Sequence, residues 1–204
     1  MSRTDDRFDA RAETYDTASR IARADMVARH IRDAVVLHPT MRLLEYGAGT
    51  GLVSERLADR VGSITLADRS TGMLEVLRRK VDAGVFGDAR VWDFDVGRGD
   101  TSGETFDRIV SSMVLHHIPD LDPVLTGLAT LLTDDGIACL VDLDAEDGSF
   151  HRDREAFDGH NGFDREAFGA RLRRCGFADV TFTSGGHIDK DGTRYPLFLA
   201  IAKR

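Results

Sequence analysis

The chain has 204 residues, of which 42% are hydrophobic and 30% charged, and its formal net charge is −8. This length suits a single domain, and the negative charge argues against sequence-independent binding of nucleic acid, which relies on Lys and Arg contacts to phosphate. No apolar run approaches the roughly 18 residues of a membrane-spanning helix and no apolar signal region opens the sequence, so we expect a cytoplasmic protein that is not embedded in a membrane.

Two residue types, the cysteines and the N-terminal arginines, bear on function. The cysteines, Cys139 and Cys175, have neither the spacing of a metal site nor that of a redox pair, so we expect free, buried thiols and no metal. The N-terminal region is rich in arginine, which we interpret as the solvated face of a helix with Ile21, Val27 and Ile31 on its apolar side; a local basic patch is the alternative. The arginines concerned are Arg20, Arg23, Arg29 and Arg32.

The first strong pattern is an apolar strand over 41–46 that turns over alternating glycines into an amphipathic helix over 52–60. Such a turn brings bare backbone N–H groups and a helix N-terminus against a ligand, and it is typical of nucleotide and nucleoside cofactors. A dinucleotide motif would place its third glycine where this chain has Leu52. Glu45 just before the turn suits a positively charged ligand better than a pyrophosphate.

A second strand, over 63–67, ends in Asp68, nineteen residues after Gly49. A carboxylate at this point can accept hydrogen bonds from both hydroxyls of a ribose, although a helix-entry role is the simpler alternative. Ser70 or Thr71 is a suitable N-cap for a helix over 71–83.

The third strand, over 89–93, is followed by Asp95, which we expect to accept a hydrogen bond from an adenine amino group, with Asp93 as the alternative partner. A fourth strand over 107–112 then ends in a polar turn that carries His116 and His117.

The remaining pattern is a helix over 121–132, a strand over 137–142, an irregular polar segment and a helix over 164–175. Two further strands, over 180–183 and 195–201, are separated by a turn region at 185–192, which predicts antiparallel pairing. Alternation of strands and helices indicates a parallel sheet covered on both faces. Ligands of such sheets lie beyond the carboxyl ends of the strands, where Glu45, Asp68 and Asp95 are placed.

With these elements in this order, the chain resembles the class I S-adenosylmethionine-dependent methyltransferases, especially the small-molecule group of type 11 and type 12. The matching residues are 45–51, 68–70, 72–74, Asp95, 106–107 and 111–119. The resemblance implies an α/β, Rossmann-like fold with a mostly parallel seven-stranded sheet, its last strand antiparallel, and helices on both faces. The single domain, 1–204, would comprise a helical cap (1–38), a cofactor-binding core (41–142), an acceptor-side loop (143–163) and a C-terminal helix with an antiparallel strand pair (164–204).

The resemblance also implies S-adenosylmethionine as the cofactor and assigns residues to its parts. Glu45 and the glycine turn would hold the methionine part, Asp68 the ribose, and Asp95 with Val96 the adenine. Tyr15 would close the N-terminal segment over the cofactor. The full set of expected cofactor residues is Tyr15, Glu45, Gly47, Ala48, Gly49, Gly51, Asp68, Arg69, Met73, Asp95, Val96, Ser111, Ser112 and Met113.

Methyl transfer is an in-line displacement that needs a base only where the acceptor must lose a proton. His117 is the candidate base, and His116 and His160 are candidate contacts to a small-molecule acceptor, although any of them can equally be a packed histidine. A monomer or homodimer is expected. The alternatives are a cofactor sensor without catalysis and, disfavoured by Leu52 and by the short chain, an NAD(P)-dependent oxidoreductase.

Overall fold

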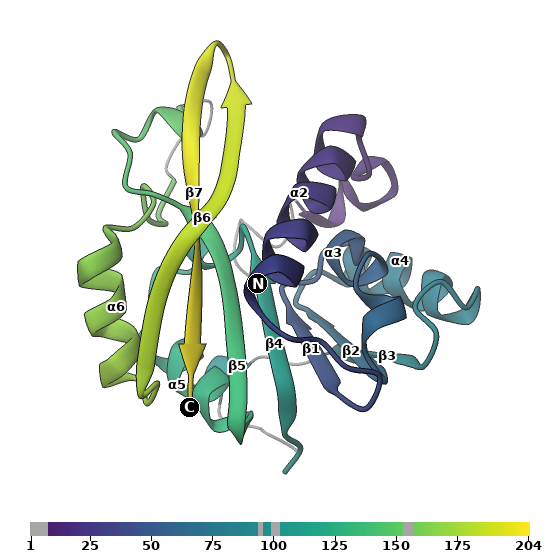
Figure 1. Ribbon diagram of the computed structural model, residues 1–204. Helices are drawn as coiled ribbons and strands as arrows, with labels where there is room; N and C mark the ends of the chain where they lie inside the picture. Colours follow the sequence, from purple (N-terminus) through teal and green to yellow (C-terminus); the bar gives the residue numbers. More distant parts are fainter. Residues whose placement is uncertain (1–7, 94–95, 99–102, 153–156) are drawn as a thin grey trace.

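The computed structural model describes residues 8–93, 96–98, 103–152 and 157–204, and it is built on one seven-stranded sheet (Figure 1). The spatial order of the strands is β3-β2-β1-β4-β5-β7-β6. The first five strands pair in parallel, and β7 is antiparallel to both of its neighbours. The predicted fold class is therefore confirmed. The strands are β1 Arg42–Tyr46, β2 Ser63–Asp68, β3 Ala89–Asp93, β4 Phe106–Ser112, β5 Leu132–Leu143, β6 Asp179–Lys190 and β7 Thr193–Lys203.

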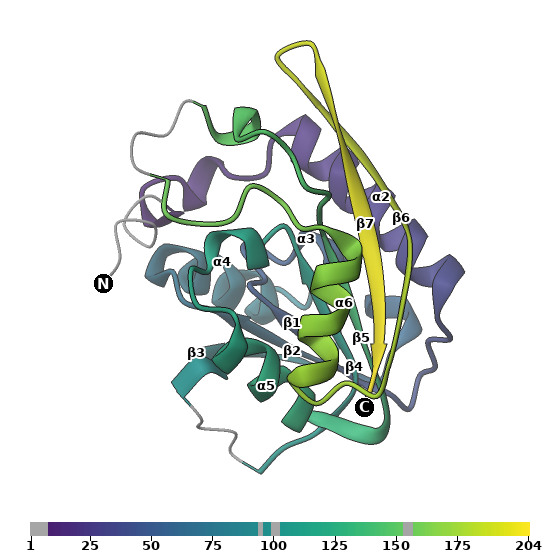
Figure 2. The same cartoon turned by 90° about the vertical axis from the view of Figure 1, so that its left-hand side faces the viewer.

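Helices cover both faces of the sheet, which lies between them (Figures 1 and 2). α2 (Ala18–Ala34), α3 (Leu52–Glu55) and α4 (Thr71–Asp82) lie on one face, and α5 (Asp122–Thr130) and α6 (Arg165–Arg174) on the other. Among the described residues, none of these helices combines the length and the apolar character needed to cross a bilayer. Short 3₁₀ turns complete the architecture: η1 Ala12–Thr14, η2 Ala58–Arg60, η3 Val96–Arg98, η4 Leu115–His117 and η5 Ser149–His151.

Two apolar layers hold the helices to the sheet. Because successive strand side chains point to opposite faces, Leu43 packs in the layer under α2 and α3, whereas Leu44 packs in the layer under α5 and α6. Both leucines are fully buried, and each contributes about 1.5–3 kcal/mol of transfer free energy. Cys139 lies in the first layer and Cys175 in the second, both as free thiols, as predicted.

Side chains at the helix starts explain where three helices begin. The hydroxyl of Thr17 accepts from the backbone N–H of Arg20, and Ser70 and Asp164 make the same type of cap at the starts of α4 and α6. Each cap satisfies an N–H group that has no partner within its helix, which stabilises the helix by about 1 kcal/mol. The predicted caps at Ser70 and Asp164 are confirmed.

Several predicted element boundaries were wrong. The strand expected over 137–142 begins at Leu132, and the strand expected over 180–183 extends to Lys190. The helix expected over 52–60 ends at Glu55, because the backbone N–H of Leu57 bonds to Ser54 and tightens the chain toward η2. The expected turn region at 185–192 is instead a bulge in β6, and the chain reverses only at Asp191 and Gly192. Both of those residues have positive φ, at 51° and 77°, which is the conformation a two-residue hairpin turn requires.

Candidate active site

The strand order reverses between β1 and β4, and a cavity of about 670 Å³ opens beyond the carboxyl ends of the strands at this point. In open α/β sheets this crevice is the usual ligand site. Residues from the ends of β1, β2 and β4 line it, together with the N-terminal segment, η5 and the end of β6. The chain segments that contribute are therefore far apart in the sequence.

The glycine turn between β1 and α3 lines the cavity through Gly47 and Gly49, whose φ angles are +69° and +58°. A Cβ at Gly47 would lie 2.4 Å from a methyl carbon of Val114, so no larger residue fits there without a shift. Gly51 does not line the cavity; it precedes α3, and a Cβ there would lie 2.7 Å from the ring of Phe86. The geometry gives Gly51 a packing role, and its predicted contact to a cofactor has no support from its position.

Glu45 points a buried carboxylate toward the cavity and is only 3% exposed. Its Oε2 atom accepts a hydrogen bond from the backbone N–H of Ser54 at 3.0 Å, which ties the end of β1 to α3. Burial raises the pKa of the Glu45 carboxyl to about 7, because a desolvated carboxylate loses its hydration. A cation placed beside Glu45 would restore its ionised form.

Asp68, at the end of β2, is bonded to the glycine turn. One carboxylate oxygen accepts from the backbone N–H of Gly49 at 2.7 Å and the other from that of Ser70 at 2.9 Å. These two bonds hold the Asp68 carboxylate at the cavity wall, beside the glycine turn.

The N-terminal segment covers this part of the cavity. Asp9 accepts from the hydroxyl of Ser70 at 2.6 Å and from the backbone N–H of Gly72 at 3.0 Å. Asp16 accepts from the hydroxyl of Thr50 and from Lys80, whose Nζ lies 2.9 Å away. These bonds anchor the segment on both sides of Tyr15, which lines the cavity beside Gly49.

Most of the residues expected at the cofactor and acceptor sites line this single cavity. Asp95 lies outside the described residues, so its contact with adenine stays a prediction. The expected residues that line the cavity are Tyr15, Glu45, Gly47, Ala48, Gly49, Asp68, Arg69, Met73, Ser112, Met113, His116 and His117.

Val96 and Ser111 are buried behind the cavity wall and do not line it. Val96 packs so closely on α5 that a Cβ at Gly127 would lie 2.3 Å from its side chain. Met113, two residues after Ser111, has a φ of +60°, an unusual value for a residue with a side chain. Such backbone strain costs about 1–3 kcal/mol and is concentrated at functional sites.

Three histidines meet on the β4–β5 side of the cavity. His116 and His117 follow β4 in η4, and His151 comes from η5. The ring centroids of His116 lie 4.0 Å from that of His117 and 5.1 Å from that of His151. Nδ1 of His116 is 2.5 Å from Oδ1 of Asp142, a carboxylate at the end of β5 with no exposed surface.

His151 was not predicted as a site residue, whereas His160 was predicted to contact the acceptor. His160 lies outside the cavity lining. Its Nε2 bonds to the carbonyl oxygen of Ile118 at 3.0 Å, and its backbone N–H donates to the carbonyl oxygen of His116 at 2.8 Å. In this position, His160 is better placed to hold η4 than to contact an acceptor. The only sequence signal for His151 was its place in the segment expected on the acceptor side.

The arginines of α2 were interpreted as one solvated face of the helix, but only two of the four are exposed. Arg29 and Arg32 are exposed, whereas Arg20 and Arg23 are half-buried and line the cavity. The Arg20 guanidinium lies 4.1 Å from the centroid of the Tyr15 ring, and burial lowers the pKa of Arg23. Ile21, expected on the apolar side, is 36% exposed.

Further lining residues that the sequence did not indicate are Phe8, Arg11, Phe150, His151, Asp158 and Lys190.

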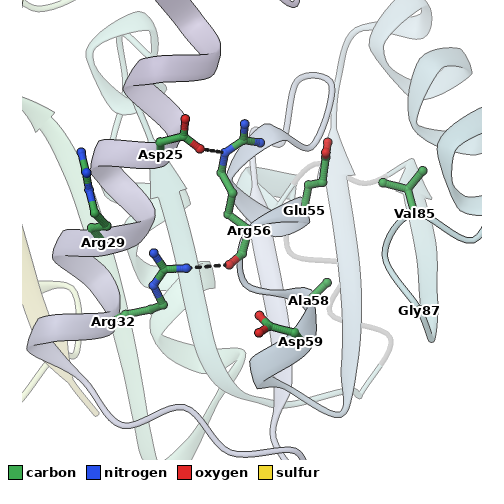
Figure 3. Close-up of a pocket in the computed structure, with 9 residues that line it drawn as sticks. All are labelled: Asp25, Arg29, Arg32, Glu55, Arg56, Ala58, Asp59, Val85 and Gly87. Carbon is green, nitrogen blue, oxygen red and sulfur yellow. Dashed lines mark hydrogen bonds and ion pairs between the residues drawn. The ribbon is translucent and has the colours of Figure 1, made fainter.

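A second hollow, of about 750 Å³, lies between α2, α3 and the loop after α4 (Figure 3). Two bonds link its residues: Arg56 pairs with Asp25, and Arg32 donates to the carbonyl oxygen of Arg56 at 3.1 Å. It lies away from the carboxyl ends of the strands, and we assign no site to it.

Comparisons with known proteins agree with this geometry. Residues 44–138 match the family model described as a methyltransferase domain. An uncharacterized methyltransferase of Mycobacterium tuberculosis is 33% identical over 109 residues, which cover 53% of this chain and 54% of that protein. An uncharacterized methyltransferase of Schizosaccharomyces pombe is 34% identical over 138 residues, which cover 60% of this chain and 48% of that protein. The match thus spans about half the length of these relatives.

Among solved structures, a SAM dependent methyltransferase from Aquifex aeolicus is similar with a TM-score of 0.70 and 17% identity, over 95% of this chain and 97% of that one. At this identity the likeness concerns the fold alone. Together with the sheet order, it shows that the chain has the Rossmann-like fold of S-adenosylmethionine-dependent methyltransferases, and residues 44–138 are similar to a methyltransferase domain.

Proposed function

We propose that this protein transfers a methyl group from S-adenosylmethionine to an O, N, C or S atom of a small molecule. One observation carries the proposal: acidic groups and histidines line different sides of the same cavity. Glu45, Gly49 and Asp68 lie at the ends of β1 and β2, whereas His116 and His117 follow β4. The cavity therefore offers one side for a cationic nucleoside and another for the molecule that receives its methyl group.

The charge of the β1–β2 side favours this cofactor over a dinucleotide. S-adenosylmethionine carries an ammonium and a sulfonium, and a cation beside the buried Glu45 carboxyl stabilises its ionised form. A pyrophosphate at the same place would bring negative charge against a buried carboxyl. We assign the methionine part to Glu45 and the glycine turn, the ribose to Asp68, and cover of the cofactor to Tyr15.

The other side of the cavity favours an acceptor that is negatively charged or that ionises. Lys190 lines it in addition to the histidines, and its Nζ lies 2.8 Å from the carbonyl oxygen of Phe150. Holding the acceptor atom in line behind the sulfonium methyl is worth about 7–11 kcal/mol of barrier. Where the acceptor must lose a proton, His117 is the candidate base.

Calorimetry with S-adenosylmethionine, its demethylated product and NAD tests the cofactor. We expect the first two to bind and NAD to leave no signal; binding of NAD alone would reject the proposal.

Incubation with labelled S-adenosylmethionine and fractionated metabolite extracts then tests transfer, with the labelled product identified by mass. Binding without transfer to any fraction would favour a cofactor sensor.

A further inference from the structure

We propose that His116, His117 and His151 form a binding site for one divalent transition-metal ion, most suitably zinc, with its open position toward the acceptor. The three side chains lie on η4 and η5, and all of them line the cavity. Their role as a metal site stands on this geometry. The use of the metal in catalysis rests on the proposed methyl transfer.

The spacing of the histidines is close to that of a three-histidine site. One ring nitrogen of each of His116, His117 and His151 lies within 4.8 Å of the other two. Zinc binds imidazole nitrogens at about 2.0–2.1 Å, which places nitrogens of a tetrahedral site roughly 3.3 Å apart. To form such a site, the nitrogens must come closer by up to about 1.5 Å through rotation of the rings.

Asp142 provides the second feature of a built metal site. Its Oδ1 lies 2.5 Å from Nδ1 of His116, and its two oxygens also accept from the backbone N–H groups of His116 and Leu143, at 3.2 and 2.8 Å. Metal-binding histidines usually donate their second nitrogen to a carboxylate in this way, which fixes the ring and strengthens the other nitrogen as a ligand. For His116 that other nitrogen is Nε2, on a ring that lines the cavity.

The aromatic residues around the histidines form a partly apolar shell. The ring of Phe150 lies 4.9 Å from that of His151 and 6.3 Å from that of His116, and Phe157 lies 4.0 Å from His151 and 5.8 Å from His117. Such a shell limits access of water and strengthens the attraction between a metal ion and an anionic ligand. Three protein nitrogens plus one open position is the ligand count of catalytic zinc.

The open position gives the metal a chemical role toward a hydroxyl or thiol acceptor. A divalent ion lowers the pKa of a bound O–H or S–H group, so the proton passes to water and the acceptor atom becomes an anion. That atom then forms its bond to the methyl carbon as the carbon–sulfur bond of the sulfonium breaks, and the neutral thioether leaves. His117 would then act as a ligand and not as the base.

Metal binding by the full-length protein tests the proposal without any activity measurement. The protein is stripped with chelator and titrated with Zn²⁺ by calorimetry and with Co²⁺ by absorption spectroscopy. We expect one equivalent to bind and the cobalt spectrum to show tetrahedral coordination. His117→Ala and His151→Ala should each weaken binding by more than about 100-fold, and Asp142→Asn by about 10–100-fold.

His38→Ala is the matched control, because His38 is exposed and the hydrogen bonds of its ring go to nearby Thr40. It should bind metal as the unchanged protein does. Each variant is also titrated with S-adenosylmethionine, whose predicted site lies on the β1–β2 side; retained binding shows that the variant is folded. No metal bound by the unchanged protein, or equal metal binding by the histidine variants, would overturn the proposal. Metal bound at these histidines in a protein that binds no S-adenosylmethionine would reject the proposed function and leave the metal site standing.

Discussion

Glu45 is a buried carboxyl whose charge decides how the cavity receives a cation. Its pKa of about 7 makes the ionised form a minority below neutral pH. We predict that the affinity for S-adenosylmethionine rises as the pH increases from 6 to 7.5, by about five- to tenfold, because the apparent affinity follows the fraction of protein in the binding-competent form. Calorimetry in buffers of different ionisation enthalpy should also show release of protons on binding.

Glu45→Gln provides the control for this assignment. The amide keeps the shape of the side chain and loses its charge, so binding should weaken by roughly 10–100-fold, the worth of a hydrogen bond to a charged group. The pH dependence between 6 and 7.5 should disappear in this variant. If it persisted unchanged, another group would be responsible and the placement of the cofactor ammonium beside Glu45 would be wrong.

Gly49 and Gly84 separate the cost of a strained backbone from the cost of filling the cavity. Both have positive φ, at 58° and 74°, but only Gly49 lines the cavity, and a Cβ at Gly84 meets nothing within 4 Å. We predict that Gly49→Ala and Gly84→Ala each lower the stability by about 1–2 kcal/mol, the cost of the left-handed conformation for an alanine. Only Gly49→Ala should weaken binding of S-adenosylmethionine, by more than about tenfold, because its methyl group occupies space and reorders the turn at the ligand. Urea unfolding and calorimetry measure the two effects; equal losses of affinity in both variants would contradict the role of Gly49.

Among the elements, the N-terminal segment covers the cofactor side of the cavity, and the partly buried Asp9 anchors it. Asp9→Ala leaves the hydroxyl of Ser70 and the backbone N–H of Gly72 without their acceptor. We predict that this change speeds dissociation of S-adenosylmethionine by about fivefold or more, because the cover opens more often. Stopped-flow displacement by the demethylated product measures the rate.

Glu13→Ala is the matched control in the same segment. Glu13 pairs with Arg79 at 2.6 Å, but both side chains are more than half exposed, and surface pairs of this type contribute about 0–1 kcal/mol. The dissociation rate should therefore change little. Equal acceleration by both substitutions would mean that the segment is held by its overall charge and not by the bonds of Asp9.

The same elements show how far the sequence predicts this molecule. The strands, the glycine turn and the positions of Glu45 and Asp68 were predictable, because each depends on local periodicity and on the rule that strand ends meet at one edge. The hairpin reversal was misplaced, since two glycines at 185–186 and the Asp191–Gly192 pair are both turn signals, and only pairing with β7 shows which one the chain uses.

The cluster of His116, His117 and His151 could not be predicted from the sequence, for a different reason. His116 and His117 could be read as a polar turn after a strand, but His151 follows them after 34 residues, in a segment without periodicity. Its place depends on tertiary contacts: the hydroxyl of Tyr195 lies 2.8 Å from that of Ser149, and Lys190 bonds to Phe150. The β6–β7 hairpin thus fixes η5 over the cavity.

For the whole molecule, the cavity brings together segments that are far apart in the sequence. The N-terminal segment from Phe8, the strand ends of the sheet and Lys190 of the hairpin all line it, so a ligand there contacts parts that separate when the protein unfolds. We predict that S-adenosylmethionine at 100 times its Kd stabilises the protein by about 2.7 kcal/mol, which for a chain of this size raises Tm by roughly 5–11 °C. NAD at the same concentration should leave Tm unchanged, and Glu45→Gln should show a smaller rise, because its affinity is lower at a fixed ligand concentration. Differential scanning calorimetry measures all three, and a rise in Tm with NAD but not with S-adenosylmethionine would show that the cavity is built for a dinucleotide.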